Sequence, residues 1–163
     1  MPKDDSRDLI EVKIGALIMD PNTNTPIVVL KGVGSEAVLP IWVGAFEANA
    51  IALEIEKIVP QRPMTHDLLR NVIIEFGLSA VRVVVTDLKD NTFYASIELS
   101  DENGELVTLD ARPSDAIALA LRLDCPIYVE RHVLELSAAS TQQQQDQDVG
   151  DPGGVDEWPE LIG

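Results

Sequence analysis

Two nearly identical phrases place the strongest constraint on how this chain can fold. Segments 62–70 and 112–122 read RPMTHDLLR and RPSDAIALALR. Each begins with Arg-Pro, continues with a hydroxyl residue and an aspartate, and enters an apolar stretch that another arginine closes. A proline near the first helical position, with Ser, Thr or Asp beside it, is typical of a helix start. Because a helix start exposes unpaired N–H groups that can hold an anion, the phrases predict either two well-capped helices or two halves of an anion-handling site.

The remainder of the body predicts a sheet with helices packed against it. Alternating apolar residues and β-branched runs, separated by turn residues, predict strands over 8–19, 27–31, 37–43, 80–88, 92–99, 105–110 and 126–130. Helical spacing predicts helices over 44–59, 65–76 and 113–123, and a short closing helix over 131–136. The expected fold class is α+β, with three main helices packed against a mixed, largely antiparallel sheet.

The charge of the chain is strongly acidic and unevenly distributed. The 163 residues carry 28 acidic and 12 basic side chains, for a formal net charge of −16. Six of the acids and no base lie in the Gln-rich segment 137–163, which we expect to be a disordered tail. Residues 1–8 are expected to be flexible, which leaves 9–136 as one domain. Since that body is also acidic, a broad basic footprint for nucleic acid is excluded, and any such contact needs local arginines or bridging metal ions.

Cysteine usage and hydropathy favour a cytoplasmic protein. Cys125 is the only cysteine, so no intramolecular disulfide can form, and its apolar neighbours predict a buried free thiol. The N-terminal segment is polar and lacks the apolar core of a secretory signal. No apolar run approaches the roughly 20 residues that a membrane span requires, so no membrane association is expected.

Five short blocks follow one another in a recognisable order along the body. They are LPIWVG followed by Glu47-Ala48, then RPMTHDLL, DNTFYA, DARPSDAIALALR and PIYV. Together they resemble the bifunctional nuclease domain family, a small bacterial and plant domain long catalogued as being of unknown function. The resemblance covers about residues 9–136. It implies an α+β fold with a mixed sheet and, from the activity attributed to plant members, hydrolysis of both RNA and DNA.

Phosphodiester hydrolysis requires an activated water, a grip on the phosphate and stabilisation of the developing charge. Histidine can transfer protons near neutral pH, arginine can hold phosphate, and carboxylates can hold divalent ions. We therefore expect seven residues to form the site: His66, Asp67 and Asp115 as catalytic groups, Arg62 and Arg112 on phosphate, and Glu47 and Asp110 on Mg²⁺ or Mn²⁺. No organic cofactor is indicated.

These candidates also have structural interpretations. Asp67 and Asp115 each lie in the first turn of a predicted helix, where a carboxylate caps the helix and suits its dipole. The arginines before the prolines can pair with those carboxylates instead of phosphate. Trp42, Phe93 and Tyr94 can stack on bases, although core packing is the favoured role for Trp42 and Phe93.

Two further functions remain open. The acidic body repels nucleic acid, which favours a non-enzymatic regulatory or binding module, including one that self-associates. Alternatively, the two Arg-Pro helix starts can serve an anion or nucleotide sensor. If the two phrases do form one site, Asp67 and Asp115 must face each other across a single cleft.

Overall fold

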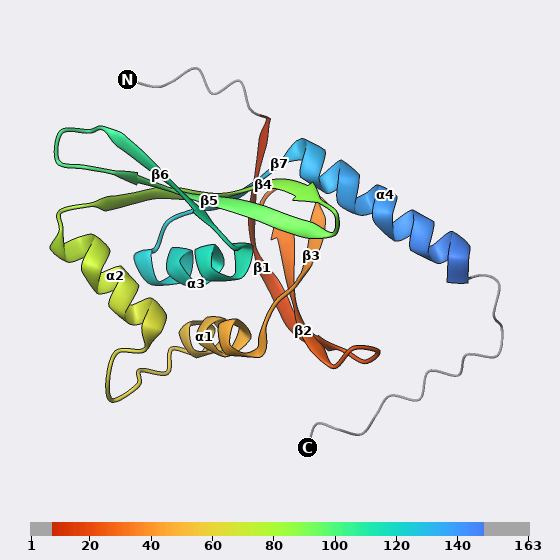
Figure 1. Ribbon diagram of the computed structural model, residues 1–163, viewed down its shortest axis with the longest axis horizontal. Helices are drawn as coiled ribbons and strands as arrows, with labels where there is room; N and C mark the ends of the chain where they lie inside the picture. The colour runs from red at the N-terminus through yellow and green to blue at the C-terminus, as the bar shows by residue number, and fades with distance from the viewer. Residues whose placement is uncertain (1–7, 149–163) are drawn as a thin grey trace.

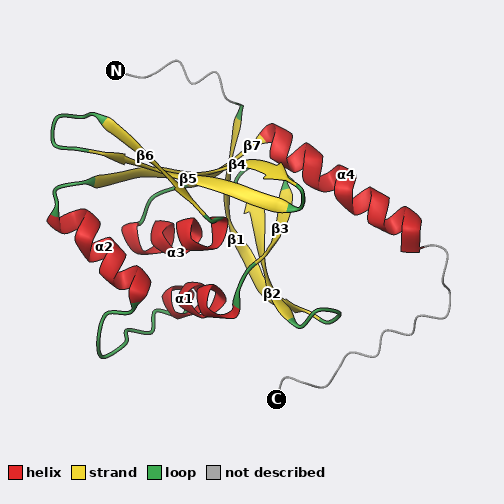
Figure 2. Ribbon diagram, in the orientation of Figure 1, coloured by secondary structure: helices red, strands yellow, loops and turns green. Residues whose placement is uncertain are grey.

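One seven-stranded sheet and four helices make up the part of the chain that the structure describes, residues 8–148 of a computed structural model (Figures 1 and 2). The elements in chain order are β1 (Leu9–Asp20), β2 (Thr25–Gly32), β3 (Val38–Trp42), α1 (Ala45–Ile55), α2 (Thr65–Glu75), β4 (Ser79–Lys89), β5 (Thr92–Ser100), β6 (Leu106–Ala111), α3 (Pro113–Leu123), β7 (Ile127–Glu130) and α4 (Arg131–Asp148). The predicted α+β class is confirmed.

The sheet is built from two antiparallel three-stranded meanders. Strands β1, β2 and β3 form the first, and β4, β5 and β6 form the second; each meander leads into a helix. The short strand β7 joins them, giving the order β3-β2-β1-β7-β4-β5-β6. It runs antiparallel to β1 and parallel to β4, so the sheet is mixed but largely antiparallel, as the sequence predicts.

Three helices form a layer against the sheet, with α3 at its centre. Helix α3 packs on β4 and β5, while α1 and α2 flank it (Figure 1). Eight of its eleven residues are buried, among them Ile117 at 0% exposure. Because α3 lies between its two neighbouring helices and the sheet, the side chains at its start and end are held by all three helices.

Helix α4 lies apart from that layer and packs on β4 and β7 (Figure 1). Three consecutive residues of β4, Val83, Val84 and Val85, are at most 1% exposed. Since neighbouring side chains in a strand point to opposite faces, this strand is covered on both.

The first helix ends earlier than predicted. The spacing predicted a helix over 44–59, but α1 ends at Ile55. Lys57 adopts a left-handed conformation with φ 56°, its N–H donates to the Glu54 carbonyl, and the Ile58 N–H donates to the Leu53 carbonyl. This pair of bonds is a Schellman motif, which glycine usually closes. The end of α1 could not be predicted from the sequence, because lysine occupies the left-handed position where a glycine would have indicated it.

The last helix continues beyond its predicted end. We expected a closing helix over 131–136 and a disordered tail from 137, yet α4 extends to Asp148. The added segment is rich in Ala and Gln, which favour helix, and contains neither Gly nor Pro. The expectation was therefore wrong for residues 137–148. The predicted flexible segment 1–7 and the remainder of the tail, 149–163, lie outside the described residues.

Candidate functional site

Both Arg-Pro phrases begin a helix, as predicted, and each places its aspartate in the third helical position. Helix α3 starts with Pro113 after the extended Arg112, and α2 starts at Thr65 after the extended Met64. Asp67 and Asp115 therefore occupy equivalent positions in the two first turns. Their surroundings nevertheless differ, because each carboxylate takes a different arginine.

Four side chains form one hydrogen-bonded chain, which we call the Arg112 cluster: Glu47, Arg112, Asp115 and His66. The guanidinium of Arg112 donates from Nη2 to Glu47 Oε1 at 2.7 Å and from Nε to Asp115 Oδ2 at 2.9 Å. The other oxygen of Asp115, Oδ1, lies 2.9 Å from His66 Nε2. The cluster thus joins the first turns of all three helices in the layer.

The polarity of these bonds fixes the proton on the imidazole. An ionised carboxylate can only accept, so when the ring is neutral and Asp115 is ionised, His66 carries its hydrogen on Nε2 and donates it to Asp115. Its other nitrogen, Nδ1, then keeps a lone pair, and no residue within 8–148 forms a hydrogen bond to it. Asp115 and Glu47 raise the pKa of the Arg112 guanidinium, because its charged form is hydrogen-bonded to both carboxylates.

Within the Arg112 cluster the histidine and Glu47 are mostly buried, and the arginine is mostly exposed. The His66 and Glu47 side chains are only 11% and 14% exposed, whereas Arg112 is 66% exposed. The inner groups are therefore fixed by packing, while the guanidinium is open to solvent and its Nη1 makes no hydrogen bond within the described residues.

Asp67 belongs to a second arrangement, centred on Arg122. Arg122 Nε donates to Asp67 Oδ1 at 2.8 Å, and its two remaining nitrogens donate to the carbonyls of Ala118 and Ala50, each at 2.9 Å. The arginine side chain is 3% exposed. Because the Ala50 carbonyl lies in α1, this buried guanidinium ties α1, α2 and α3 together.

The second oxygen of Asp67 caps its own helix. Oδ2 accepts the Met64 N–H at 2.9 Å, so the capping interpretation is confirmed for this residue. Burial alone raises the pKa of Asp67, but the Met64 N–H and the Arg122 guanidinium outweigh it and lower the pKa below its usual value of 3.8. These contacts assign Asp67 a structural role.

The structure thus brings together four of the seven predicted site residues and leaves three apart. Asp110 is exposed on the edge strand β6 and forms no hydrogen bond with Arg112 or Arg122. Asp67 and Asp115 bind different arginines, and only Asp67 lines the cavity beside Arg122, so they do not face each other across one cleft. No three His, Cys, Asp or Glu side chains among those that the structure describes, residues 8–140, are grouped as metal ligands.

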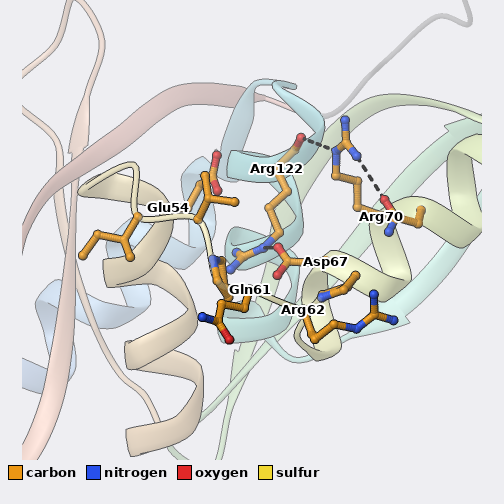
Figure 3. Close-up of a pocket in the computed structure, with 11 residues that line it drawn as sticks. Glu54, Gln61, Arg62, Asp67, Arg70 and Arg122 are labelled. Atoms are coloured by element: carbon orange, nitrogen blue, oxygen red, sulfur yellow. Dashed lines mark hydrogen bonds and ion pairs between the residues drawn. The ribbon is translucent and has the colours of Figure 1, made fainter.

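Arg62 lines a cavity of about 380 Å³ between α1, α2 and the end of α3, which we call the Arg62 cavity (Figure 3). Its wall combines aliphatic and charged groups, namely Glu54, Ile58, Val59, Pro60, Gln61, Arg62, Pro63, Asp67, Arg70, Asn71 and Arg122. Arg70 Nε donates to the Arg122 carbonyl at 3.2 Å. Sequence reasoning missed Arg70 and Arg122 as site residues, although the closing arginine of each phrase was the available signal.

A second cavity, of about 260 Å³, adjoins the exposed arginine and contains two aromatic rings; we call it the Trp42 cavity. Its wall includes Trp42, Phe93 and Arg112. Trp42 is 50% exposed and its Nε1 donates to Asp20 at 2.8 Å, so the expectation that this ring packs in the core was wrong. Phe93 is partly buried and packs against the core, as predicted.

No helix within the described residues is both long and apolar enough to cross a membrane.

Comparison with known proteins identifies the family. The model of the bifunctional nuclease domain matches residues 28–142. An uncharacterized protein of Mycobacterium tuberculosis is 39% identical over 138 residues, which cover 85% of this chain and 82% of that protein. Bifunctional nuclease 2 of Oryza sativa subsp. japonica is 30% identical over 100 residues, 60% of this chain and 31% of the rice protein. Bifunctional nuclease 1 of Arabidopsis thaliana is 29% identical over 111 residues, 66% of this chain and 34% of its own length. The chain therefore belongs to the bifunctional nuclease domain family.

Proposed function

We propose that this protein hydrolyses phosphodiester bonds of RNA or DNA at the Arg112 cluster. One observation carries the proposal: His66 from the first Arg-Pro helix start and Asp115 from the second meet at 2.9 Å, with the exposed Arg112 bonded to the same carboxylate. A proton-transfer group and a phosphate-binding group thus lie next to each other. The name of the family and the names of the plant relatives, bifunctional nucleases, support the same reaction.

His66 acts as the general base in this proposal. Its Nδ1 takes a proton from a water, whose oxygen forms a bond to phosphorus as the bond to the leaving oxygen breaks. The leaving oxygen takes a proton from solvent. Asp115 keeps the ring in the required tautomer and stabilises the imidazolium that forms.

Arg112 binds a non-bridging phosphate oxygen through its free Nη1. Glu47 and Asp115 hold the other side of the guanidinium, so its orientation is fixed before substrate arrives. The two carboxylates offset the positive charge of the guanidinium, which favours weak binding that depends less on salt than binding to a broad basic surface does.

The Trp42 cavity supports a nucleic-acid substrate because it joins stacking rings to the same arginine. A base that enters this cavity can lie against the exposed Trp42 ring while its phosphate reaches Arg112. Such local contacts allow an acidic protein to bind a polyanion without a broad basic surface.

A divalent ion was expected at Glu47 and Asp110, but the arrangement of the described side chains does not fit one. Glu47 gives Oε1 to Arg112, and Asp110 lies elsewhere on β6. We therefore assign no step to a metal; Mg²⁺ or Mn²⁺ dependence is tested directly by adding EDTA.

The test is a nuclease assay on single-stranded RNA and DNA with the purified chain, with and without EDTA, beside His66→Ala. His132→Ala is the matched control, because His132 is also histidine but is 49% exposed and lies at the start of α4. We expect cleavage that His66→Ala lowers at least about 100-fold and that the control preserves. Equal residual cleavage in the wild type and His66→Ala would contradict the proposal and indicate a contaminating nuclease.

A further inference from the structure

Strand β6 ends the sheet on one side, and among residues 8–148 it pairs with β5 alone (Figure 1). Its side chains are open to solvent, and Leu106, Val107 and Leu109 are 42%, 40% and 43% exposed. Because successive side chains of a strand point to opposite faces, β6 exposes apolar groups on both faces. An exposed apolar edge of this kind is a template for pairing with another strand.

The opposite edge of the sheet is protected in ways that β6 is not. Strand β3 contains Pro40, which has no N–H to donate, and helix α4 contacts that strand. Strand β6 contains neither proline nor lysine, and its register with β5 has no bulge. Its single charged side chain is that of Asp110, near its end. The devices that usually block an edge strand therefore belong to β3.

The hairpin before β6 shows which backbone groups point away from the sheet. At its closing pair the Asp101 N–H donates to the Glu105 carbonyl at 2.9 Å. Since hydrogen-bonded pairs alternate along an antiparallel ladder, Val107 and Leu109 exchange their bonds with β5. The N–H and C=O groups that point away from β5 are then those of Leu106, Thr108 and Asp110.

A second copy of β6 fits this edge in an antiparallel arrangement about a two-fold axis. With Thr108 opposite Thr108 of the second copy, the outward groups of the two strands face each other, and Leu106 lies opposite Asp110. The two aspartates therefore do not meet. On the other face Val107 lies opposite Leu109 of the second copy, so four apolar side chains come together. They lie beside the buried residues of β5 with which they pair.

We propose that two copies of this chain dimerise by antiparallel pairing of their β6 strands, which joins their sheets into one. A second copy is the occupant because this edge complements itself in backbone groups and apolar side chains. With one acid in six residues, β6 also limits the repulsion between two chains of net charge −16. The inference does not rest on hydrolysis. A strand edge is a small interface, so we expect a reversible dimer with a dissociation constant on the order of 10 µM.

The test is sedimentation velocity of the full chain over a concentration series from about 1 to about 200 µM, which brackets that dissociation constant. Val107→Glu adds a charge to the apolar cluster, and Thr108→Pro removes an outward N–H without breaking a bond to β5. Val38→Glu is the matched control, because Val38 is 56% exposed on the opposite edge strand β3. Leu68→Glu tests a rival surface, since Leu68 is 57% exposed on α2.

We expect the wild type to dimerise, and each β6 variant to raise the dissociation constant at least about tenfold. Val38→Glu and Leu68→Glu should change it less than about twofold. A wild type that stays monomeric throughout the series, or a dimer that both β6 variants retain, would overturn the inference. Equal loss of the dimer in Val38→Glu or Leu68→Glu would also overturn it, because the interface would then lie on β3 or α2.

Amide hydrogen exchange gives a second readout that needs no variant. The Thr108 N–H points away from β5, so in the monomer it is open to solvent and should exchange rapidly. In the dimer it donates to the second copy. We therefore expect its exchange to slow at least about tenfold between the lowest and highest concentrations of the series. Exchange of Thr108 that does not depend on concentration would count against pairing through β6, even if the chain dimerises.

Discussion

His66 Nε2 lies 2.9 Å from Asp115 Oδ1, although 49 positions separate the two residues in the chain. One comes from the start of α2 and the other from the start of α3, and each follows its own Arg-Pro phrase. The two phrases therefore contribute different groups to one chain of hydrogen bonds. Their similarity lies in how each starts a helix, and their difference lies in what each aspartate binds.

The first prediction concerns the tautomer of His66. In Asp115→Asn the amide oxygen can still accept a hydrogen bond from His66, but the neutral amide no longer stabilises the imidazolium. The amide NH₂ can also donate to Nε2, which leaves the hydrogen of the ring on Nδ1, where it prevents His66 from acting as the base. We expect kcat/KM for nucleic-acid cleavage to fall at least about 100-fold, because Asp115 positions both the base and Arg112. The measurement is the pH profile of kcat/KM for both proteins. An unchanged profile and rate would show that Asp115 does not position the base.

The second prediction concerns stability at Asp67. Asp67→Asn leaves the buried Arg122 guanidinium without a counter-charge and weakens the cap on α2, so the free energy of unfolding should fall by about 2 kcal/mol. Urea denaturation followed by circular dichroism measures the change. Lys57→Ala is the control, because its ion pair is exposed and contributes less than about 1 kcal/mol.

The same aspartate makes stability depend on pH in a defined direction. Its pKa is lowered on folding, so the unfolded chain binds its proton first as the pH falls. The stabilisation is therefore complete above the usual value of 3.8 and is lost as the pH falls through the lower, folded pKa. The difference in unfolding free energy between wild type and Asp67→Asn should shrink below about pH 4. A difference that stays constant down to pH 2 would contradict this assignment.

The third prediction concerns the single cysteine. Burial raises the pKa of the Cys125 thiol from 9.0 to about 11, so its thiolate fraction at pH 8 is about 100-fold smaller than in an exposed cysteine. We expect alkylation by iodoacetamide to be slower in the native protein than in guanidinium-unfolded chain by at least that factor. Mass spectrometry of timed samples measures both rates. Similar native and unfolded rates would show that the thiol is exposed and reactive.

The fourth prediction concerns the end of α1. Lys57 adopts a left-handed conformation that costs a side-chain-bearing residue about 1 kcal/mol, so Lys57→Gly should raise the unfolding free energy by about 0.5 kcal/mol after the entropy of glycine is subtracted. Glu56→Gly is the matched control, because Glu56 has right-handed helical geometry and should lose stability. The sign of the two changes in thermal or urea unfolding decides the prediction.

Local sequence signals predicted most elements of this fold because their causes are local. Pro113 at the first helical position and the apolar spacing after it gave α3 its observed bounds. Helix α2 ends at Glu75, one residue before its predicted end, and Gly77 follows its C-cap Phe76 in a left-handed conformation. The end of α1 was not predicted, because Lys57 takes the left-handed conformation that glycine usually takes after a helix. The helical continuation to Asp148 was missed because a polar, Gln-rich composition was taken as disorder.

The candidate site was harder to predict because its geometry depends on contacts between distant segments. Which arginine each aspartate binds follows from how α3 lies between α1 and α2, and no spacing in the sequence encodes that arrangement. Trp42 shows the same limit: its place on an edge strand and its bond to Asp20 leave the ring exposed. In the sequence, Arg122 only closed the second Arg-Pro segment, and no role was predicted for it. In the structure its side chain is 3% exposed and holds Asp67.

The joining strand β7 determines when the seven-stranded sheet can be completed during synthesis. It pairs with Leu9 through Val12 at one end of the chain's body and with Val83 through Val85 near the middle, so both pairings need residues 127–130. During synthesis the two meanders can form hairpins as they emerge, but their inner edges, on β1 and β4, stay open until the ribosome has released β7. A chain that stops before residue 127 therefore exposes the edges of β1 and β4 in addition to those of β3 and β6, and we expect such fragments to aggregate rather than to retain half of the fold.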